Sequence, residues 1–571
     1  MARRLKLNKP QDLAKAKCIA SFFNRIINGE VPAKLQKFLR QTYLVALEKD
    51  PNDKTKLRPL GVPAAMRRIA AVLVLSEYRS SFAEHILPFN FAIGIGGGVD
   101  VIVKTVQLAI DKYMIGPEKK KAFPTRSLVS LDIRNMFNAV SRERLREIIA
   151  EKFPSLEAFA DLIYDDFGET IVRLEDGTWT SIPVEEGFSQ GCPASPVFAA
   201  IVLNEILSKI YGELEERAKQ RLKDGDKGDD NLGSLGILLA YVDDVNAVLC
   251  HDDVDYFLKR FVEEATPKGA ILNTEKTRIM TSTNGTPLTD KLLATGTLKQ
   301  MMLGQRLKTA ISNYSTEIID GTRKPVEVTD GLRVLGAPVG STSFCQNFLS
   351  KALNRAKTDA KLLLKNLEDL QTILRIYSTC TAHKITHLFS SDVYNTAVEE
   401  LPNNYYLWDS PLTQDFSQMT ENVLTNITNS HTLPLYSQVI ANMSIAQGGL
   451  GLQSPRANAI TAHMTTAKRC LQYIHEGVWL GHNMTRPLLP DSINLLYSDW
   501  QTSDDRSWRI FRKYIKDFNQ IATGGKPQND SDFIFKCSLN GTREKAKELA
   551  SQKIRTEVLE SEFITPKHVQ D

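Results

Sequence analysis

The sequence predicts a mixed α+β fold, with helical regions on both sides of a middle section that contains short buried strands. Apolar residues recur every three or four positions over 13–47, 64–83 and 99–114, and again beyond residue 345, which is the period of an amphipathic helix. Between these regions, the runs at 127–133 and 236–250 have the length and apolar composition of strands. At 571 residues the chain is too long for one core, so several domains are expected.

A basic hairpin is predicted near the N-terminus. In YLVALEKDPNDKTKLRPLGVP (43–63) two extended runs flank a Pro-Asn-Asp turn, and the first run overlaps the end of the preceding helical pattern. Residues 1–80 contain 17 Lys and Arg against 6 Asp and Glu, a local charge of +11 in a chain whose net charge is +4. Such segments are most often solvated surface. The more specific hypothesis is that this segment belongs to a module that faces a polyanion.

The middle of the chain combines strands with acidic ends. SLVSLDI (127–133) predicts a buried strand with Asp132 near its end, and a helix is expected to begin after Ser141. The charged segment near 212–234 predicts a helix end followed by an exposed insertion loop. GILLAYVDDVNAVLC (236–250) predicts a β-hairpin with acids at its tip.

Composition argues against several classes of protein. No apolar stretch approaches the roughly 20 residues of a membrane span, and the basic start MARRLKLNKP is not followed by an apolar core. The seven cysteines are scattered, without a C-x-x-C pair or a histidine at ligand spacing. We therefore expect an intracellular protein of the nucleus or cytoplasm, neither secreted nor in a membrane, without structural zinc.

The acids at strand ends suggest a reaction. Aspartates of adjacent strands can converge on Mg²⁺, which prefers carboxylate and phosphate oxygens. Two such ions about 4 Å apart can activate an attacking hydroxyl and stabilise a leaving pyrophosphate, which is the chemistry of nucleotidyl transfer. Taken singly, Asp132 and the pair Asp243-Asp244 are ordinary strand-end and turn residues. Their combination and order favour a catalytic site.

Three motifs in order resemble those of reverse transcriptases. They are D-I-R-N-M-F (132–137), G-x-x-Q-G-x-x-x-S-P (187–196) and Y-V-D-D (241–244). Three further runs resemble the fingers motif, the fourth palm motif and the primer grip of that family: LRPLGVP (57–63), GAILNTEKT (269–277) and LRVLGAPVG (332–340). Five features look most like LINE-type, non-LTR retroelement enzymes. They are the runs IINGEVP (26–32), LVALEK (44–49) and LRPLGVP (57–63), the glycine-rich segment 94–98, and GGLGL (448–452). A group II intron-like enzyme is the nearer alternative, and a retroviral one fits the N-terminal half poorly.

The resemblance implies a right-hand polymerase with fingers, a palm built on an antiparallel sheet, and a thumb, followed by a mostly helical C-terminal region. The implied boundaries are 1–110 for N-terminal helices and fingers, 111–330 for the palm with part of the fingers, 331–400 for primer grip and thumb, and 401–571 for the extension. The implied partners are an RNA template, a DNA or RNA primer, and dNTPs. No apurinic-type endonuclease, Cys-His knuckle or RNase H pattern is visible in the sequence.

The resemblance also implies a metal site. Asp132 and Asp243 would bind two Mg²⁺ ions, with Mn²⁺ as a possible substitute, and Asp244 would assist as a more loosely placed acid. Lys276 resembles the residue that protonates the pyrophosphate leaving group, although a solvated surface lysine is an equally good interpretation. Val242 stands where many LINE-type enzymes have alanine, a change that removes no metal ligand.

Five further residues have implied roles at the substrate. Phe137 resembles the aromatic gate that excludes a ribose 2′-hydroxyl, with core packing as the alternative. Gln190 and Gly191 resemble the turn that lies along the template and the incoming nucleotide. Arg58 and Lys56 in the basic hairpin would reach the triphosphate.

Other functions compete with this hypothesis. GFSQG (187–191) fits the G-x-S-x-G elbow of a serine hydrolase with Ser189 as nucleophile. An elbow serine leads straight into a helix, and Pro193 and Pro196 argue against one there, because proline inside a helix costs about 3 kcal/mol. A catalytically inactive, domesticated nucleic-acid-binding protein with the same fold is a second alternative. An RNA-dependent RNA polymerase is a third.

Overall fold

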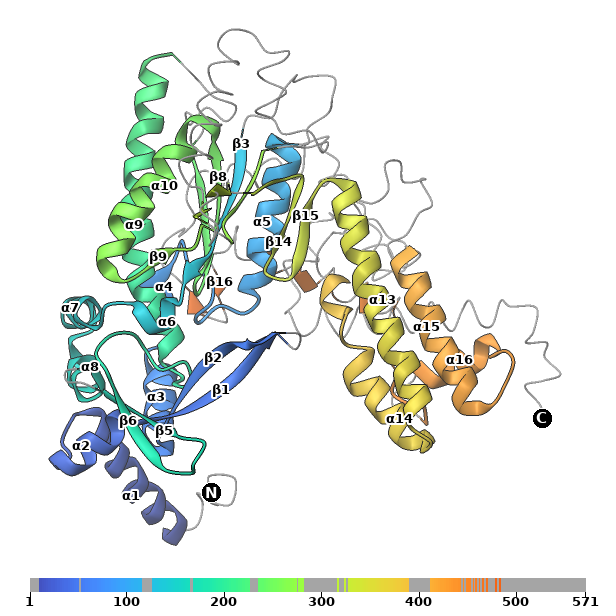
Figure 1. Cartoon of the computed structure of the whole chain (residues 1–571), viewed down its shortest axis with the longest axis horizontal. Coiled ribbons are helices and arrows are strands. Elements are labelled where there is room, and N and C mark those ends of the chain that lie inside the picture. The colour runs from blue at the N-terminus through green and yellow to red at the C-terminus, as the bar shows by residue number, and fades with distance from the viewer. Residues whose placement is uncertain are drawn as a thin grey trace.

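The computed structural model describes most of the first 442 residues, together with short pieces up to residue 483. The longer described ranges are 10–50, 53–114, 126–164, 168–225, 235–274, 276–281, 327–389 and 411–442. Figure 1 shows a body of helices and strands formed by the N-terminal and middle parts of the chain, with a group of helices beside it formed by later residues. Most of the predicted C-terminal extension (401–571) lies outside the described part, apart from 411–442 and the short pieces.

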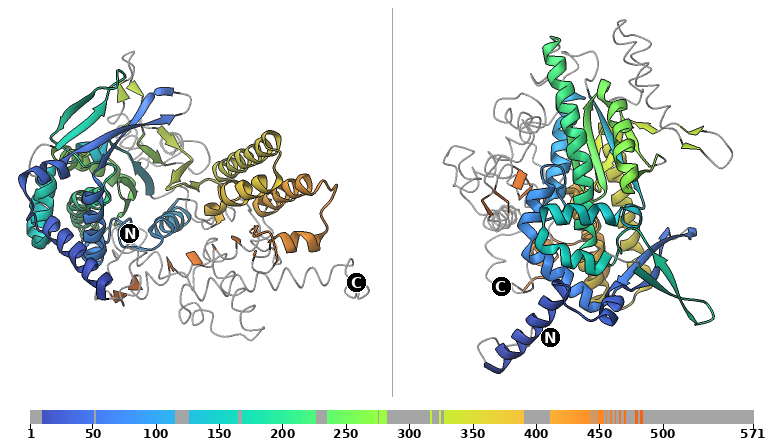
Figure 2. Two further views of the ribbon diagram at one scale, coloured as in Figure 1. Left: turned by 90° about the horizontal axis from the view of Figure 1, so that it is seen from below. Right: turned by 90° about the vertical axis from the view of Figure 1, so that its left-hand side faces the viewer.

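Four helices and a four-stranded sheet form the N-terminal part of the molecule. The helices are α1 (Pro10–Ile27), α2 (Ala33–Arg40), α3 (Ala65–Glu77) and α4 (Arg79–Ile86). The sheet has the order β2-β1-β5-β6 and contains β1 (Thr42–Asp50), β2 (Asp53–Pro63), β5 (Gly168–Arg173) and β6 (Trp179–Val184). β1 and β2 form the predicted antiparallel hairpin, and the helical pattern before it ends at Arg40. Figure 2 shows both hairpins of this sheet projecting from the helical body.

A five-stranded sheet lies at the centre of the molecule. Its order is β13-β10-β3-β8-β7, made of β3 (Arg126–Leu131), β7 (Ile237–Tyr241), β8 (Asp244–Cys250), β10 (Arg278–Met280) and β13 (Glu327–Thr329). Leu128 packs in one hydrophobic cluster with α5 (Gly98–Tyr113), whereas its neighbour Val129 packs in a second cluster with α9 (Ser195–Lys223) and α10 (His251–Ala265). Because helices cover both faces, these strands are apolar at successive positions.

Shorter elements connect the two sheets. They are β4 (Ile133–Arg134), α6 (Met136–Ala139), α7 (Arg142–Lys152), η2 (Pro154–Leu156), α8 (Glu157–Tyr164), η3 (Thr266–Lys268) and β9 (Ile271–Leu272). Helix α7 begins directly after Ser141, as the sequence predicts, and the Ser141 side chain caps it by accepting a hydrogen bond of 3.1 Å from the amide of Arg144. A cap of this kind stabilises a helix by about 1 kcal/mol.

The later part of the described chain is mainly helical, as predicted beyond residue 345. A hairpin of β14 (Gly331–Val334) and β15 (Ala337–Gly340) precedes α13 (Thr342–Asn366), α14 (Leu370–Ile376), η4 (Tyr377–Thr381), η5 (Thr386–Phe389), α15 (Pro411–Thr428) and α16 (Leu435–Asn442). Short strand pairs β11 (Thr316–Glu317) with β12 (Arg323–Lys324) and β16 (Val478–Trp479) with β17 (His482–Asn483) complete the elements. None of the helices in the described residues is long and apolar enough to cross a lipid bilayer.

Candidate active site

Three aspartates lie at one edge of the central sheet, which is the edge formed by the ends of strands and not by an outer strand. Asp132 directly follows β3, and Asp244 begins β8, the antiparallel neighbour of β3. The last paired residues of these strands are Leu131 and Val245, so both acids lie one step beyond that pair. Asp243 occupies the tip of the β7–β8 hairpin predicted from the sequence. Sheet order therefore brings together acids that are more than a hundred positions apart in the chain.

The electrostatics of this edge favour a cation. Desolvation raises the pKa of Asp243, and repulsion by Asp132 adds to the effect, while the nearby positive charge of Arg58 lowers it. Desolvation, together with repulsion by Asp243 and Asp132, raises the pKa of Asp244 to about 6, against a smaller opposing effect of Arg333. Three mutually repelling carboxylates form a site whose ionised state a divalent cation would stabilise.

The donors present suit a magnesium ion that a substrate helps to bind. Within the described ranges, no three His, Cys, Asp or Glu side chains are grouped so that they could hold a metal ion by themselves. Mg²⁺ usually binds through one or two carboxylates together with substrate phosphates and water, rather than in a cage of protein ligands. The carboxylates of Asp132, Asp243 and Asp244 fit that manner of binding.

Asp132 is held by the turn between β9 and β10. Its Oδ2 accepts a hydrogen bond of 2.7 Å from Asn273 Nδ2, and its carbonyl accepts one of 2.8 Å from the Asn273 amide. Lys276 in the same turn places Nζ 3.5 Å from Asp132 Oδ2, with about half of the lysine side chain exposed. The fold thus brings Lys276 to the carboxylates. Asn273 was missed by the sequence argument, although it lies inside the GAILNTEKT run.

The turn 187–191 packs against the segment that follows Asp132. The amide of Phe188 donates to the carbonyl of Phe137, and the amide of Gly187 donates to the carbonyl of Val140 at 3.0 Å. Gly187 has φ +73°, and a Cβ there would lie 2.2 Å from the carbonyl carbon of Asn138. Only glycine fits this conformation and this contact. The backbone of the second motif (187–196) is therefore hydrogen-bonded to the end of the first motif (132–137) and to the residues that follow it.

The same turn touches the basic hairpin through Gly191. Its amide donates to the carbonyl of Gly61 at 3.0 Å, and a Cβ at Gly191 would lie 2.6 Å from that oxygen. The adjacent Gln190 is partly exposed. The turn thus joins the two sheets, and its glycines permit close approach of two backbones.

Arg142 was another residue missed by the sequence argument. It is almost fully buried, and its guanidinium donates to the carbonyls of Gly187 and Val184, each at 2.8 Å. Burial lowers the pKa of its guanidinium. A single arginine in a helix start has no sequence pattern that marks it, because its carbonyl partners come from another loop.

One argument against the hydrolase hypothesis is wrong in detail. Helix α9 begins at Ser195, and Pro196 lies in its first turn, where proline breaks no helical hydrogen bond. The chain does, however, pass from Ser189 through a turn before the helix. The carbonyl of Ser189 accepts a hydrogen bond of 2.7 Å from Ser195 Oγ, so this segment is held as a backbone turn.

Phe137 lies in α6, close to Asp132 along the chain. Its side chain is partly buried and packs against the hydrophobic cluster beneath the central sheet. One part of the side chain therefore contributes to core packing, and the remaining exposed part is what a gate at the substrate would use.

Arg58 lies exposed on β2 opposite Leu47 of β1. Its charge reaches Asp243, so the hairpin brings a guanidinium toward the carboxylates. Lys56 lies on the same strand, but its side chain is outside the described part of the structure.

One face of the sheet β2-β1-β5-β6 carries exposed aromatic and basic side chains. Tyr43 pairs with Ile171, and Arg173 pairs with Trp179, so alternation along the strands places these residues on one face. The rings of Tyr43 and Trp179 meet edge to face at 6.2 Å, and Arg173 lies 6.0 Å from the Trp179 ring centre. Trp179 is 60% exposed. Arg58 shares this face through its pairing with Leu47.

Asn90 contacts the acidic hairpin from a segment the sequence argument did not single out. It is fully buried, its Nδ2 donates to the carbonyl of Val242 at 3.0 Å, and the amide of Val242 donates to its Oδ1 at 3.2 Å. Nothing in the sequence marks an asparagine in LPFNFAIG as a partner of a hairpin far along the chain.

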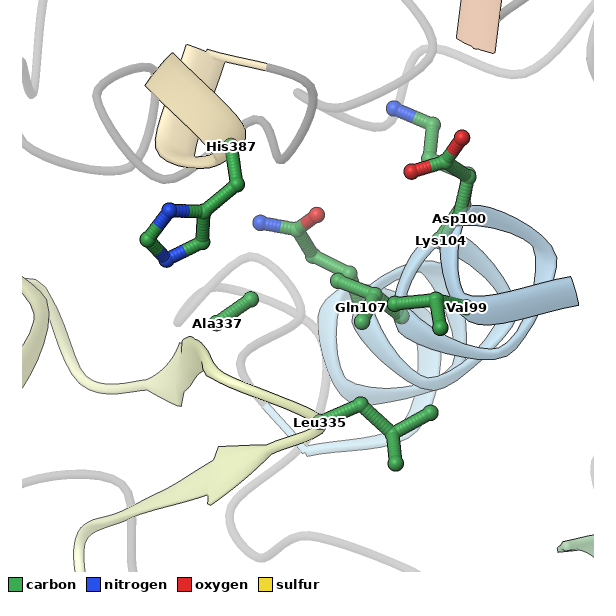
Figure 3. A pocket seen from close by; sticks show the side chains of 8 residues that line it. Val99, Asp100, Lys104, Gln107, Leu335, Ala337 and His387 are labelled. Atoms are coloured by element: carbon green, nitrogen blue, oxygen red, sulfur yellow. The ribbon is translucent and has the colours of Figure 1, made fainter. Parts of the chain in front are cut away.

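A cavity of about 100 Å³ lies between α5, the β14–β15 hairpin and η5. Figure 3 shows the side chain of Gln107 pointing from α5 toward His387, with Leu335 of the hairpin tip below them. Burial, with a contribution from Arg333, lowers the pKa of His387. None of the residues predicted for catalysis lines this cavity.

Comparison with known proteins agrees with the motifs. Residues 49–339, about half of the chain, match the family described as Reverse transcriptase (RNA-dependent DNA polymerase). A Retrotransposable element SLACS 132 kDa protein of Trypanosoma brucei gambiense is 24% identical over 321 residues, which is 55% of this chain and 23% of that protein. The chain thus spans about a quarter of that relative.

Solved structures resemble the chain only distantly. A telomerase from Candida albicans, in complex with a TWJ fragment of telomeric RNA, is 12% identical with a TM-score of 0.39, over 84% of this chain and 65% of that one. Apo telomerase from Candida tropicalis is 14% identical with a TM-score of 0.33, over 81% and 68% of the two chains. Similarity this weak supports no functional conclusion.

Proposed function

The chain belongs to the reverse transcriptase (RNA-dependent DNA polymerase) family, and from this premise we propose that it copies an RNA template into DNA by two-metal nucleotidyl transfer. The observation that carries the proposal is the meeting of Asp132, Asp243 and Asp244 at one edge of the sheet β13-β10-β3-β8-β7. All three lie inside the region that matches the family. The similarity to a retrotransposable element protein supports an origin in a LINE-type retroelement.

The carboxylates of Asp132 and Asp243 would hold two Mg²⁺ ions, with Asp244 beside them. Bound Mg²⁺ supplies charge stabilisation at the attacking and leaving oxygens of a phosphoryl transfer. The chain's part is to orient its carboxylates before the substrate arrives, and the hydrogen bond from Asn273 Nδ2 does so for Asp132. Burial, and after it repulsion by Asp243 and Asp132, raises the pKa of Asp244, and a bound cation would offset both effects on the ionised carboxylate.

Other residues would bind and orient the nucleotide. Arg58 would donate hydrogen bonds to the triphosphate from the exposed face of β2. Gln190 and the backbone of Gly191 would contact the template and the incoming nucleotide, while the space of the missing side chain at Gly191 is taken by the backbone of Gly61. Lys276 stands within reach of Asp132 and would give a proton to the leaving pyrophosphate, or alternatively serve only to balance charge. Lys56 would add to the positive charge of the hairpin.

The exposed face of the sheet β2-β1-β5-β6 supports binding of the unpaired template. Aromatic side chains on which bases stack, flanked by basic residues, are typical of proteins that bind single-stranded nucleic acid. Trp179 and Tyr43 provide the rings, and Arg173 and Arg58 the charges. An RNA strand on this face would lead toward Arg58 and the carboxylates.

We also propose how the elements divide among the parts of a right-hand polymerase. The helices α1–α4 and the sheet β2-β1-β5-β6 would form the fingers, and the five-stranded sheet with α9 and α10 the palm. We assign α5 to the palm as well, although most of it lies in the range 1–110 expected for the fingers, because it packs in one cluster with Leu128 of β3. The β14–β15 hairpin would be the primer grip, and α13 and α14 the thumb. The C-terminal extension expected for 401–571 would follow, and only α15, α16 and short pieces of it belong to the described part.

Primer extension tests the proposal. Purified chain, an RNA template with an annealed DNA primer, dNTPs and Mg²⁺ are combined, and wild type is compared with Asp243→Asn. We expect wild type to extend the primer and the variant to lose at least a hundredfold in rate, because one metal ligand has become neutral. Asp255→Asn, an exposed position on α10, is the matched control and keeps wild-type activity.

The outcomes separate the proposal from its alternatives. RNA binding without extension by the wild type supports the catalytically inactive, domesticated nucleic-acid-binding protein. Extension with rNTPs in preference to dNTPs supports an RNA-dependent RNA polymerase. Equal rates for wild type and Asp243→Asn contradict the assignment of the catalytic acids.

A further inference from the structure

Val242 has an unusual backbone conformation at the centre of the acidic hairpin. Its φ is +56°, in the left-handed region, which a β-branched side chain adopts only at a cost in free energy. Val242 and Asp243 form the two-residue loop between the paired residues Tyr241 and Asp244. Positive φ at the first loop position alone is the sign pattern of a type II′ turn, and glycine is the usual residue there. Valine at this position therefore needs support from outside the turn.

Asn90 supplies that support through both polar groups of its side chain. Nδ2 donates to the carbonyl of Val242 at 3.0 Å, and Oδ1 accepts from the amide of Val242 at 3.2 Å. One side chain thus fixes the peptide groups on both sides of Val242. The second of these groups links Val242 to Asp243, so its orientation sets where the Asp243 side chain begins.

Asn90 is itself held firmly. The amide of Ala92 donates to Oδ1 at 3.2 Å, which fixes the orientation of the side-chain amide. The backbone on both sides pairs with Ala240 of β7, through Phe91 N to Ala240 O at 2.9 Å and Ala240 N to Phe89 O at 2.6 Å. Asn90 makes an isolated parallel bridge to the same residue. The segment therefore acts as a short extra strand along β7, and Asn90 is buried where it reaches the hairpin tip.

We propose that Asn90 is a positioning residue for nucleotidyl transfer, holding the Val242–Asp243 peptide in the orientation that presents the carboxylates of Asp243 and Asp244. This inference rests on the proposed function. Without the side chain, the turn relaxes toward conformations that valine prefers, and the two acids move with it. A displacement of about 1 Å at a reacting centre costs on the order of a hundredfold in rate.

The first test separates hydrogen bonding from space filling. Asn90→Ala and Asn90→Leu are compared with wild type in primer extension at saturating Mg²⁺, measuring kcat and the KM for primer–template. Both variants are expected to lose about 10- to 100-fold in kcat, with the KM for primer–template within about twofold, because the nucleic-acid contacts lie elsewhere. Wild-type kcat in Asn90→Leu shows that volume alone matters and overturns the proposal.

Asn204→Ala is the matched control. Asn204 is also buried, and its Nδ2 donates to a backbone carbonyl at 2.7 Å, but that carbonyl belongs to His85 and not to the acidic hairpin. This variant is expected to lower the melting temperature while keeping kcat within about twofold. A similar loss of kcat in Asn204→Ala assigns the effect of Asn90 to general destabilisation and overturns the proposal.

A second substitution tests the strained conformation directly. Glycine adopts positive φ readily, so Val242→Gly makes the turn less dependent on outside support. In the Val242→Gly protein, Asn90→Ala is expected to lower kcat by less than about threefold. The coupling between the two residues is the difference between this loss and the loss that Asn90→Ala causes in the protein with Val242. An unchanged cost in the glycine background contradicts an action through Val242.

Hydrogen exchange distinguishes failure of this inference from failure of the proposed function. Mass spectrometry of the peptide covering 237–249 follows the Val242 amide without any enzymatic reaction. In Asn90→Ala this peptide is expected to gain about one rapidly exchanging amide, whereas peptides from α9 stay as in wild type. If wild type extends no primer, but Asn90→Ala still gains this rapidly exchanging amide, the proposed function is refuted and the support of Val242 by Asn90 is retained. Unchanged exchange refutes the support itself.

Discussion

Phe137 lies where the first motif meets the core. Its carbonyl accepts a hydrogen bond from the Phe188 amide, and its side chain packs partly against the cluster that contains Met136 and Phe188. The backbone position is therefore set by the turn 187–191. The exposed part of the ring is the part that would contact the nucleotide sugar.

Phe137→Ala tests the gate. If the ring blocks the 2′-hydroxyl, its removal lowers the preference for dNTP over rNTP by about tenfold or more, since steric rejection in a pocket is of that size. The measurement is kcat/KM for a dNTP and the matching rNTP in single-nucleotide extension. A loss of rate with unchanged preference identifies Phe137 as a packing residue.

Gly187 is the residue most restricted by its neighbours in the second motif. Its φ of +73° and the predicted clash with the carbonyl carbon of Asn138 act together. Gly187→Ala is expected to destabilise the protein by at least about 2 kcal/mol, seen as a lower midpoint of thermal unfolding. Gly212→Ala, in α9, is the control, because apart from the neighbouring residues and backbone of its own helix nothing lies within 4 Å of the added Cβ. It should raise stability by up to about 1 kcal/mol, and equal midpoints for the two variants contradict the restriction.

At the scale of elements, the sheet β2-β1-β5-β6 has two unlike faces. On β6 the side chain of Trp179 lies on the face shared with Tyr43, whereas Ile182 lies on the other face and is 49% exposed. The chemistry of the first face, rings beside guanidinium groups, suits unpaired bases and phosphates. The second face has no such combination among the described residues.

Trp179→Ala is expected to weaken binding of a primer–template with an unpaired 5′ RNA extension. Loss of one stacked base costs about 1–3 kcal/mol, a factor of roughly 5 to 150 in Kd. Fluorescence anisotropy measures Kd for this substrate and for a blunt one, on which the variant should behave as wild type. Ile182→Ala is the control from the opposite face. Equal Kd values for both variants on the extended substrate rule out stacking on Trp179.

At the scale of the whole molecule, charge is unevenly distributed. Residues 1–80 carry 17 Lys and Arg against 6 Asp and Glu, while the entire chain has a net charge of only +4. This segment includes the hairpin β1–β2 that brings Arg58 toward the carboxylates. The basic part of the chain thus adjoins the acidic site, which suits a polyanion that must enter it.

Binding of single-stranded RNA is therefore expected to weaken strongly as salt rises. Each phosphate contact contributes about −0.7 to the slope of log K against log salt concentration, and three or more contacts give a slope steeper than about −2. Titrations at several KCl concentrations measure the slope, and the double variant Arg58→Gln/Arg173→Gln, which removes two contacts, is expected to reduce its magnitude by about 1.4. A slope near zero supports the simpler interpretation that the basic segment is solvated surface.

The motifs and the strand ends were predictable because they depend on local pattern. Apolar runs bounded by acids predict strands that end at Asp132 and at the Asp243-Asp244 tip, and the structure has both. The helix that begins after Ser141 and the hairpin predicted for 43–63 follow from short-range preferences in the same way. The argument from Pro196 failed because a proline's effect depends on its position in the helix, and α9 begins one residue before it.

The sequence by itself determined the family, the strands, and which residues are candidates for chemistry, since period and spacing are properties of neighbouring residues. Only the tertiary structure decided that β3 lies beside β8, that Asn273 holds Asp132, that Gly191 meets Gly61, and that Asn90 supports Val242. These contacts join segments far apart in the chain. Their partners are chosen by sheet order and by the need of buried polar groups for hydrogen bonds, which no local pattern contains.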